Sequence, residues 1–267
     1  MKKILLTFDL EEFDIAEEYG ATLDLDTKIQ TSYVGMERIL ALLKKYDAKA
    51  TIFCTAFYAE NAPEQLQRIA ADGHEIASHG YYHDRFETAD LLKSRLKLAE
   101  ITGKNIVGFR MARMAAVDNQ AIEAAGYAYD SSLNPTWLPG RYNYLDKPRT
   151  TFNILENLKV IPASVTPFLR FPLFWLSFKN LPLFLYKHMV EQTLNTDNYV
   201  NLYFHPWEFN SLKQFNLPSY VKRVDDVVLL NKLEDFICYF KDKAQFTTIR
   251  EELGIRNFET IHKFRIR

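Results

Sequence analysis

The chain has 267 residues, of which 48% are hydrophobic and 25% charged, a composition that favours a sizeable folded core over disorder. Its formal net charge of −1 argues against a nucleic-acid-binding protein, which usually carries a strong basic excess. We expect a single domain over residues 1–267, because neither an internal repeat nor a low-complexity linker interrupts the sequence. The two cysteines, Cys54 and Cys238, lie in apolar company and are predicted to be buried and reduced, as in a cytosolic protein.

The first residues resemble the start of a signal peptide, but Asp9, Glu11 and Glu12 end the apolar run too early. We therefore predict a first strand, no signal peptide and a cytoplasmic location. No segment has enough uninterrupted apolar residues to span a bilayer.

The first half of the chain alternates apolar runs with segments of helical spacing. Glycines follow three of the predicted helices, at Gly73, Gly103 and Gly126, where helices commonly end. The predicted strands are residues 3–8, 49–55, 74–78, 106–109 and 127–130, and the predicted helices are residues 34–46, 63–71, 88–102 and 118–125. Repeated strand–helix alternation predicts an α/β fold with a mainly parallel sheet or barrel.

This rhythm breaks in an excursion at about residues 134–195. Residues 134–157 are rich in Pro, Gly, Asn and Arg and are predicted to form a long loop, and residues 167–190 are unusually aromatic. Strands are then predicted at 160–163, 199–204 and 245–249, with a helix at 225–240. The basic residues 256–267 are expected to be a solvated end.

Two histidines, His79 and His83, follow the apolar run that ends at Ser78, with the turn residue Gly80 between them. Neutral imidazole is the commonest protein ligand for a transition metal, and two so close can hold one ion if a third ligand arrives from elsewhere. Either histidine alone would more often be a packing or surface residue.

Polar side chains follow several other predicted strands: the acids at 9, 11 and 12, Arg110, the Asp130-Ser131-Ser132 run and His205. Functional groups of parallel α/β sheets gather at the carboxyl ends of the strands. Any one of these residues could be a capping or solvated group, but their common placement favours a shared site.

These motifs together resemble the polysaccharide deacetylases, the NodB-homology group. The resemblance rests on Thr7-Phe8-Asp9, Ser78-His79 with His83, Gly108-Phe109-Arg110, Tyr129-Asp130-Ser131-Ser132 and Tyr203-Phe204-His205-Pro206-Trp207-Glu208, in the order of the family. The His-Pro-Trp-Glu ending is most similar to the branch associated with exopolysaccharide and cell-surface glycan synthesis. The resemblance implies a distorted (β/α) barrel with fewer than eight parallel strands, and a hydrolase that removes the N-acetyl group from an acetamido sugar.

The resemblance also implies roles for individual residues. His79 and His83 would bind a divalent metal, with Zn²⁺ the expected ion, and the metal would polarise the amide and activate a water. Asp9 would be the general base, held and kept ionised by Arg110. His205 would be the general acid that protonates the departing amine, with Asp130 as its orienting partner.

The sequence departs from the common family pattern in three places. Leu10 replaces the usual second Asp of the first motif, so Glu11 is the nearest metal carboxylate, with Glu12 left open as the alternative. The stretch from Arg110 to Arg113 lacks the proline and the aromatic residue that usually follow the arginine in this family. Arg113 and Ser131 are expected to contact substrate. Trp207 is expected either to stack on a sugar face or to form an aromatic lid.

Residues 167–190 permit two interpretations. They could pack as the core of a helix outside the barrel, or they could touch a membrane surface or a lipid-linked glycan, since large apolar groups mixed with Arg170, Lys179 and Lys187 are typical of interfacial segments. For the function, two alternatives to a sugar deacetylase stay open. One is a non-sugar amidohydrolase that opens a cyclic amide, similar to allantoinase, and the other is an inactive sugar-binding relative.

Overall fold

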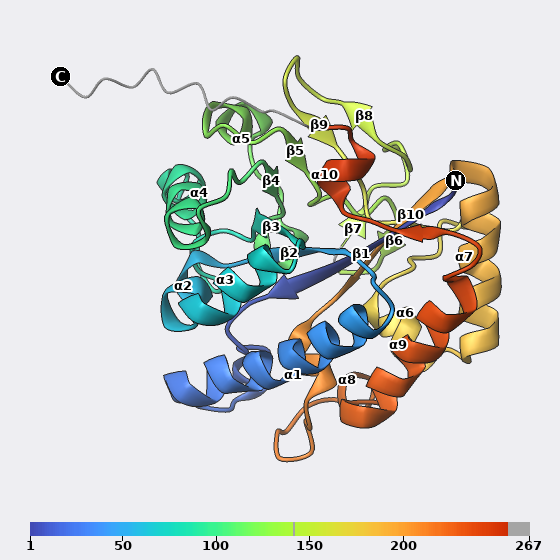
Figure 1. Ribbon diagram of the computed structural model, residues 1–267, viewed down its shortest axis with the longest axis horizontal. Helices are drawn as coiled ribbons and strands as arrows, with labels where there is room; N and C mark the ends of the chain where they lie inside the picture. The colour runs from blue at the N-terminus through green and yellow to red at the C-terminus, as the bar shows by residue number, and fades with distance from the viewer. Residues whose placement is uncertain (141, 256–267) are drawn as a thin grey trace.

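A curled sheet of mainly parallel strands forms the centre of the molecule (Figure 1). The computed structural model describes residues 1–140 and 142–255, so the expected basic tail, residues 256–267, lies outside the described residues. The strand order is β10-β1-β2-β3-β4-β5-β9-β8, with β11 also paired to β1. Their bounds are β1 Lys3–Leu10, β2 Ala50–Cys54, β3 Glu75–Ser78, β4 Gly108–Phe109, β5 Tyr129–Asp130, β8 Phe152–Asn153, β9 Lys159–Val160, β10 Tyr199–Phe204 and β11 Gln245–Phe246.

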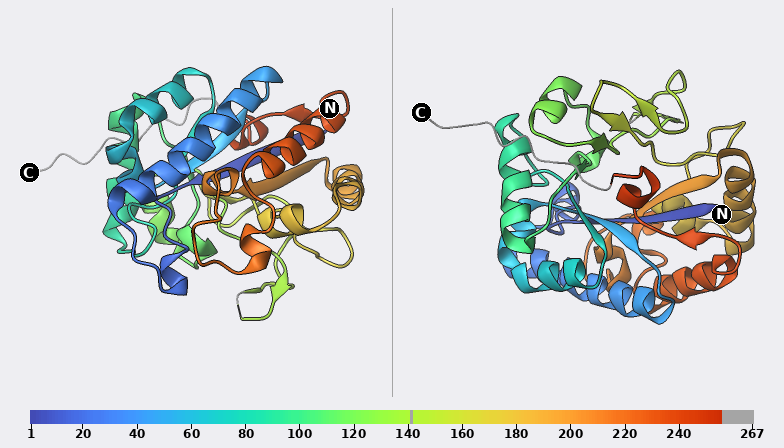
Figure 2. Two further views of the ribbon diagram at one scale, coloured as in Figure 1. Left: turned by 90° about the horizontal axis from the view of Figure 1, so that it is seen from below. Right: turned by 45° about the horizontal axis from the view of Figure 1, so that its top comes forward.

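Helices pack around the outside of this sheet, as the right-hand view of Figure 2 shows. The larger helices are α1 Leu25–Lys45, α3 Pro63–Ala71, α4 Ala89–Thr102, α7 Leu183–Asp197 and α9 Asp226–Phe240. Shorter helices are α2 Ala56–Asn61, α5 Asn119–Ala124, α6 Trp175–Asn180, α8 Ser219–Lys222 and α10 Ile249–Glu252, and three 3₁₀ turns are η1 Glu17–Tyr19, η2 Ala112–Met114 and η3 Pro206–Phe209. This curled, incomplete barrel of parallel strands confirms the predicted fold class.

The apolar runs of the sequence become strands that are buried on both faces. Seven of the eight residues of β1 are buried, and every residue of β2, β3 and β10 is buried. Strands covered on both sides read as continuous apolar runs, which is why the sequence located them well. Within this sheet the described pairings from β10 to β9 are parallel, and β8 runs antiparallel to β9.

The second half of the chain completes the same sheet that the first half begins. β10 pairs with β1 over six residues, from Lys3 opposite Tyr199 to Phe8 opposite Phe204. Between β10 and the segment that follows β9, single hydrogen bonds replace a strand ladder: the Ser164 amide donates to the Asn201 carbonyl (2.9 Å), and the Asn201 amide donates to Ser164 Oγ (2.8 Å). Residues beyond 130 therefore help to fix the position of β1.

Some expectations from the sequence need correction. The helix predicted at 34–46 begins at Leu25, and the stretches at 56–61 and 249–252 form helices that the sequence did not indicate. The predicted loop contains a small hairpin of β6 Trp137–Leu138 and β7 Tyr142–Asn143. Cys54 is buried as expected, whereas Cys238 is exposed, because it occupies the outer face of α9.

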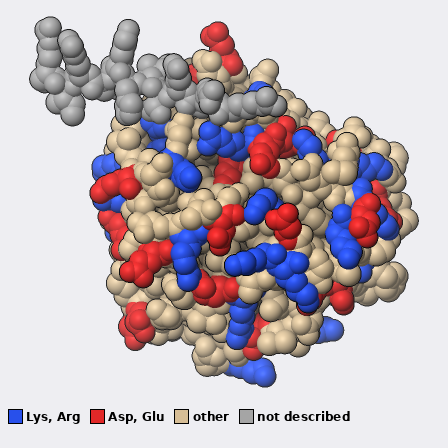
Figure 3. Space-filling view, in the orientation of Figure 1, with Lys and Arg blue, Asp and Glu red and all other residues tan. Residues whose placement is uncertain are grey.

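The aromatic segment is divided between core and surface. Leu173, Phe178 and Tyr186 are fully buried, in agreement with core packing. Phe168 and Leu169, by contrast, are 95% and 88% exposed. Over the described residues, no helix is both long and apolar enough to cross a membrane. On the face in Figure 3, acidic and basic side chains are interspersed rather than gathered into one patch.

Candidate active site

The carboxyl ends of β1, β3, β4 and β10 bring the candidate residues to one edge of the sheet. The parallel register places Phe8 beside Phe204, and Ser78 beside Phe109. The next residues along these strands are Asp9, His205, His79 and Arg110. A single pocket is lined by Asp9, Glu11, Asp14, Ile15, Glu18, His79, His83, Arg113, Met114, Trp175, Tyr203, His205 and Trp207. The shared site that the strand ends predicted is therefore present as a cavity.

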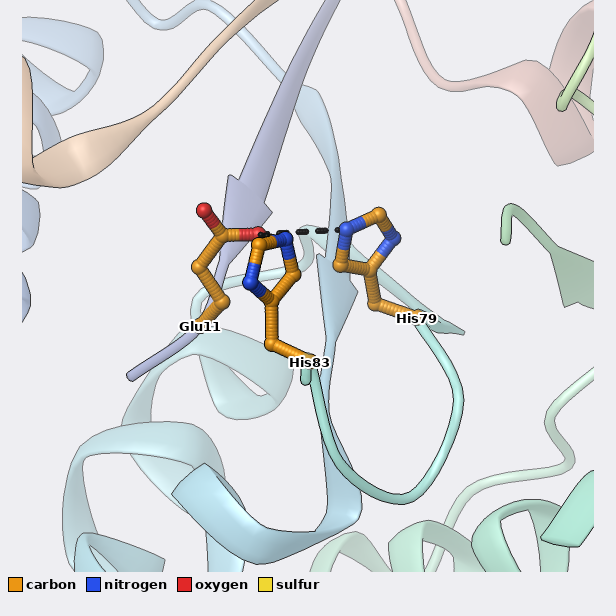
Figure 4. Close-up of side chains that lie close together, drawn as sticks. All are labelled: Glu11, His79 and His83. Atoms are coloured by element: carbon orange, nitrogen blue, oxygen red, sulfur yellow. Dashed lines mark ion pairs between the residues drawn. The ribbon is translucent and has the colours of Figure 1, made fainter. Parts of the chain in front are cut away.

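Glu11, His79 and His83 form a buried group that could hold a metal ion (Figure 4). Glu11 Oε2 lies 3.2 Å from His79 Nε2 and 3.1 Å from His83 Nε2. The three ligand atoms all lie within 4.8 Å of one another. In Figure 4 the carboxylate after β1 points toward both imidazoles, one directly after β3 and one from the loop beyond it.

Hydrogen bonds on the other ring nitrogens show why this group suits a cation. His79 Nδ1 lies 2.9 Å from the Arg110 carbonyl, and His83 Nδ1 lies 2.7 Å from Asp14 Oδ2. Both partners only accept, so each Nδ1 carries a proton, and each ring, whenever it is neutral, presents its Nε2 lone pair toward Glu11. Glu11 Oε2 is itself buried without a hydrogen-bond partner. Three lone pairs that converge in this way fit a metal ion with two nitrogen ligands and one oxygen ligand.

The charges of this group depend on one another. Burial acts to lower the pKa of His83, but the carboxylates of Glu11 and Asp14 outweigh it and raise the pKa to about 9. Burial acts to raise the pKa of Glu11, but the His83 and His79 imidazoles hold it below its ordinary value. Without a metal, a proton on His83 therefore balances the negative charges of Glu11 and Asp14. A bound cation would take over that role and displace the proton.

Two further acids support His83, and the sequence analysis did not assign either role. Glu12 accepts a hydrogen bond from the His83 amide through Oε1 (2.9 Å) and one from Thr55 Oγ1 through Oε2 (2.7 Å). Glu12 thus has other partners, and Glu11 is the carboxylate that lies beside both imidazoles. Asp14 orients the His83 ring and pairs with Arg113 Nη2 at 3.2 Å. The density of acids between 9 and 14 was the signal that could have pointed to both.

Asp9 and Arg110 form a buried ion pair. Arg110 Nη1 donates to Asp9 Oδ1 (2.6 Å) and to Thr7 Oγ1 (2.9 Å), and the Arg110 side chain is fully buried. Burial acts to raise the pKa of Asp9, but the Arg110 guanidinium and the nearby imidazoles outweigh it and hold the pKa below its ordinary value. Asp9 is therefore an ionised carboxylate in a site largely closed to water, with a fixed orientation.

His205 faces the same pocket, and its partner differs from the predicted one. His205 Nδ1 lies 3.1 Å from Glu208 Oε1, and the same oxygen accepts a hydrogen bond from the His205 amide (2.8 Å). The expectation that Asp130 orients His205 is wrong: Asp130 Oδ1 accepts hydrogen bonds from the amide and hydroxyl of Ser132. Glu208 reaches the ring because η3 turns the chain back directly after His205. The Glu208 of the quoted motif was the available signal.

All three predicted substrate contacts have partners within the protein, and two of them are buried. Trp207 is only 2% exposed, its ring stacks on His205 (centroids 4.9 Å apart), and its Nε1 donates to Glu11 Oε1 (3.2 Å), so it has no free face for a sugar. Ser131 is buried and accepts from Arg110 Nη2 (3.0 Å). Arg113 is half-exposed and lines the pocket, where it pairs with Glu18 Oε1 (2.6 Å).

Comparisons with known proteins place this site in a family context. Residues 1–129 match the family model described as polysaccharide deacetylase, and residues 131–253 match a domain of unknown function, DUF3473. A curated peptidoglycan deacetylase of Helicobacter pylori is 32% identical over 119 residues, which are 41% of this chain and 41% of that protein. The matched segment thus spans well under two thirds of that relative's length.

Two solved structures share the fold over nearly the whole chain. A Mycobacterium smegmatis structure described as a polysaccharide deacetylase covers 95% of this chain and 89% of its own, with a TM-score of 0.64 and 19% identity. The PuuE allantoinase structure covers 93% of this chain and 88% of its own, with a TM-score of 0.63 and 18% identity. At these identities the likeness establishes the architecture, and it does not choose between the two chemistries.

Proposed function

Because residues 1–129 match the polysaccharide deacetylase family model, we propose that this chain hydrolyses the N-acetyl group of an acetamido sugar. The observation that carries the proposal is the convergence of a fixed carboxylate, Asp9, a metal-capable group and an imidazole, His205, on one pocket. Hydrolysis of an unactivated amide needs a base for the water and an acid for the amine, and this pocket contains a candidate for each.

Glu11, His79 and His83 are the residues that would hold the metal, and two nitrogen ligands with one oxygen ligand favour Zn²⁺. A metal bound there would polarise the amide carbonyl and lower the pKa of a water. The protein itself orients the two imidazole rings. Asp14 fixes the His83 ring and the Arg110 carbonyl fixes the His79 ring, each with Nε2 directed inward.

Asp9 is suited to take the proton of the attacking water, because Arg110 keeps it ionised and prevents it from rotating. His205 is suited to give a proton to the sugar nitrogen as the C–N bond breaks. Burial acts to lower the pKa of His205, but Glu208, Glu11 and Asp9 outweigh it and raise the pKa above its ordinary value, which favours the protonated ring that donation requires. The products are acetate and the free amino sugar. Asp9 has then gained one proton and His205 has lost one, and exchange of one proton with solvent at each residue restores the starting state.

Acetate release from N-acetylglucosamine oligosaccharides tests this proposal. We expect activity in the wild type, and losses of about 100-fold or more in kcat for Asp9→Asn and for His205→Ala, since general acid–base groups typically contribute that much. His188→Ala, which changes an exposed histidine on α7, is the matched control and should be fully active. Hydrolysis of allantoin without acetate release, or undiminished activity of His205→Ala, would contradict the proposal.

The substrate context we propose is a lipid-linked sugar met at the inner face of a membrane, as in cell-surface glycan synthesis. The support is an ordered turn that presents apolar side chains to solvent. Phe168 and Leu169 lie at its tip, and below them the Thr166 amide donates to the Phe171 carbonyl (2.9 Å) and Thr136 Oγ1 donates to the Arg170 carbonyl (2.7 Å). Large apolar groups held in an exposed position are typical of an interaction surface.

Liposome co-sedimentation tests this context separately from catalysis. Phe168→Ser with Leu169→Ser should lower binding to anionic vesicles at least about fivefold, because each change removes most of a buried side chain's transfer energy. Leu92→Ser, which alters a 42%-exposed residue on α4, should leave binding unchanged. If the double variant binds vesicles as the wild type does, the turn has no membrane role.

A further inference from the structure

Behind His205 lies a row of buried charged groups that the proposed chemistry has not used. Glu208 touches His205 with Oε1, and its other oxygen, Oε2, lies 3.1 Å from Lys179 Nζ. The side chains of Glu208 and Lys179 are both fully buried, whereas that of His205 is 14% exposed toward the pocket. The row thus runs from the pocket into the protein interior, and Lys179 on α6 is its inner end.

The surroundings of Lys179 hold its ammonium in a fully buried position. Nζ donates to the Val221 carbonyl (2.7 Å) and lies 5.6 Å and 5.9 Å from the ring centroids of Trp175 and Trp207. The same two indoles contact the His205 ring, Trp175 edge-on at 5.1 Å and Trp207 stacked at 4.9 Å. The lysine and the histidine therefore contact the same two indoles.

Other charged groups face this row. Asp9 and Glu11 approach His205 from the β1 side, together with Glu208 from η3. Lys232 on α9 donates to the carbonyls of Lys179 (3.3 Å) and Leu181 (2.7 Å). Among the described contacts of Glu208, Lys179 is the one permanent cation.

We propose that Lys179 is a positioning residue for proton donation by His205, because its ammonium keeps the Glu208 carboxylate paired after His205 has given up its proton. This inference rests on the proposed function of His205 as the general acid. Before donation, the carboxylate has two cationic neighbours. After donation, the imidazole is neutral, and only Lys179 compensates the buried charge.

Without Lys179, donation would leave Glu208 as an isolated buried anion, a strongly unfavourable state. His205 would then retain its proton, either as an imidazolium paired with Glu208 or through a proton shared between them. Loss of the lysine should therefore make His205 a weaker acid, whereas loss of the carboxylate should make it a stronger one. These opposite directions separate a charge role from simple packing.

The test is an NMR titration of His205 in protein labelled with ¹³C-histidine, with kinetics and unfolding measured on the same variants at equal metal loading. In Lys179→Met we expect His205 to titrate about one pH unit or more above the wild type, as removal of a nearby charge typically produces. Glu208→Gln should shift the titration downward. Lys179→Arg should restore the wild-type titration, and Lys213→Met, on an exposed lysine, should not alter it.

The kinetic expectation is a loss of about 10- to 100-fold in kcat for Lys179→Met, with KM within about twofold, because the substrate touches neither Lys179 nor Glu208. If Lys179→Met is unfolded, Lys179→Met with Glu208→Gln should fold, since it buries no unpaired charge. Unfolding of both variants would show that the lysine is needed for packing alone and would overturn the inference.

The inference and the proposed function fail in different ways. A wild type that releases no acetate from any acetamido sugar would contradict the function, and the titration would still report whether Lys179 controls the protonation of His205. A fully active wild type, with a His205 titration in Lys179→Met that is unchanged or shifted downward, would contradict the inference alone.

Discussion

Gly35 on α1 permits the closest approach between the outer helices and the residues that position His205. An ideal Cβ at Gly35 would lie 1.8 Å from the Pro206 carbonyl oxygen and 2.6 Å from the Pro206 carbonyl carbon. Pro206 is the first residue of η3 and directly follows His205. The change Gly35→Ala therefore pushes α1 against the backbone of the catalytic loop rather than against a flexible side chain.

The magnitude follows from two opposing terms. Alanine is favoured over glycine inside a helix by about 1 kcal/mol. Against this, the oxygen must retreat by about 1.6 Å, from 1.8 Å to the 3.4 Å at which ordinary contact begins, and because the obstacle is backbone, the overpacking cost lies at the upper end of the usual range, about 3 kcal/mol. We expect a net loss of about 2 kcal/mol in the free energy of unfolding. Because a misplacement of about 1 Å can cost 100-fold in rate, kcat should fall by about 10- to 100-fold.

Urea titration monitored by tryptophan fluorescence gives the free energy of unfolding, and acetate release gives kcat. Gln30→Ala, on the exposed side of the same helix, is the matched control and should change stability by less than about 0.5 kcal/mol. If Gly35→Ala instead gains about 1 kcal/mol and keeps full activity, helix propensity alone governs this position, and the packing of α1 on η3 does not position His205.

Three further predictions concern buried charges and the metal. Burial raises the pKa of Asp130 to about 6, above its ordinary value of 3.8, so ionisation of Asp130 costs stability that grows from pH 3.8 to about pH 6 and is complete above it. Asp130→Asn should therefore gain up to about 3 kcal/mol at pH 8 and nothing below pH 3.8, and urea titrations that show an equal gain at both pH values would contradict this. Arg110→Met leaves Asp9 as an unpaired buried charge and should lose about 3–5 kcal/mol, with part recovered in the double variant with Asp9→Asn; a loss below about 1 kcal/mol would refute the pairing argument. Chelation should lower the melting temperature of the wild type and of the control His188→Ala, and addition of Zn²⁺ should restore it. If chelation lowers the melting temperature of His83→Ala as well, His83 is not a metal ligand.

The architecture was accessible from the sequence because its strands are buried on both faces. Such strands are short apolar runs, and β10 and α3 have the bounds predicted for them. The helix α2 was missed because it is only six residues long and follows β2 closely, and the start of α1 was missed because its first turns are mostly polar in sequence and lack apolar periodicity.

The candidate site was accessible to the extent that its residues occupy strand ends. Asp9, Arg110, His79 and His205 could be located in this way, since parallel register carries successive strand ends to the same edge. The similarity of residues 1–129 to the polysaccharide deacetylases was visible in the same motifs. The branch within the family and the cytoplasmic location stay predictions.

What the sequence could not decide was the partner of each side chain. His205 pairs with Glu208 rather than Asp130, and Trp207 faces inward to Glu11 rather than outward to substrate. These outcomes depend on the direction in which η3 turns after β10, which is set by its packing against α1. The sequence by itself thus determined which residue types reach the pocket, because local apolar patterns fix the strands and their ends. Only the tertiary structure decided which residues pair there, because those contacts join positions far apart in the chain whose distances no local pattern encodes.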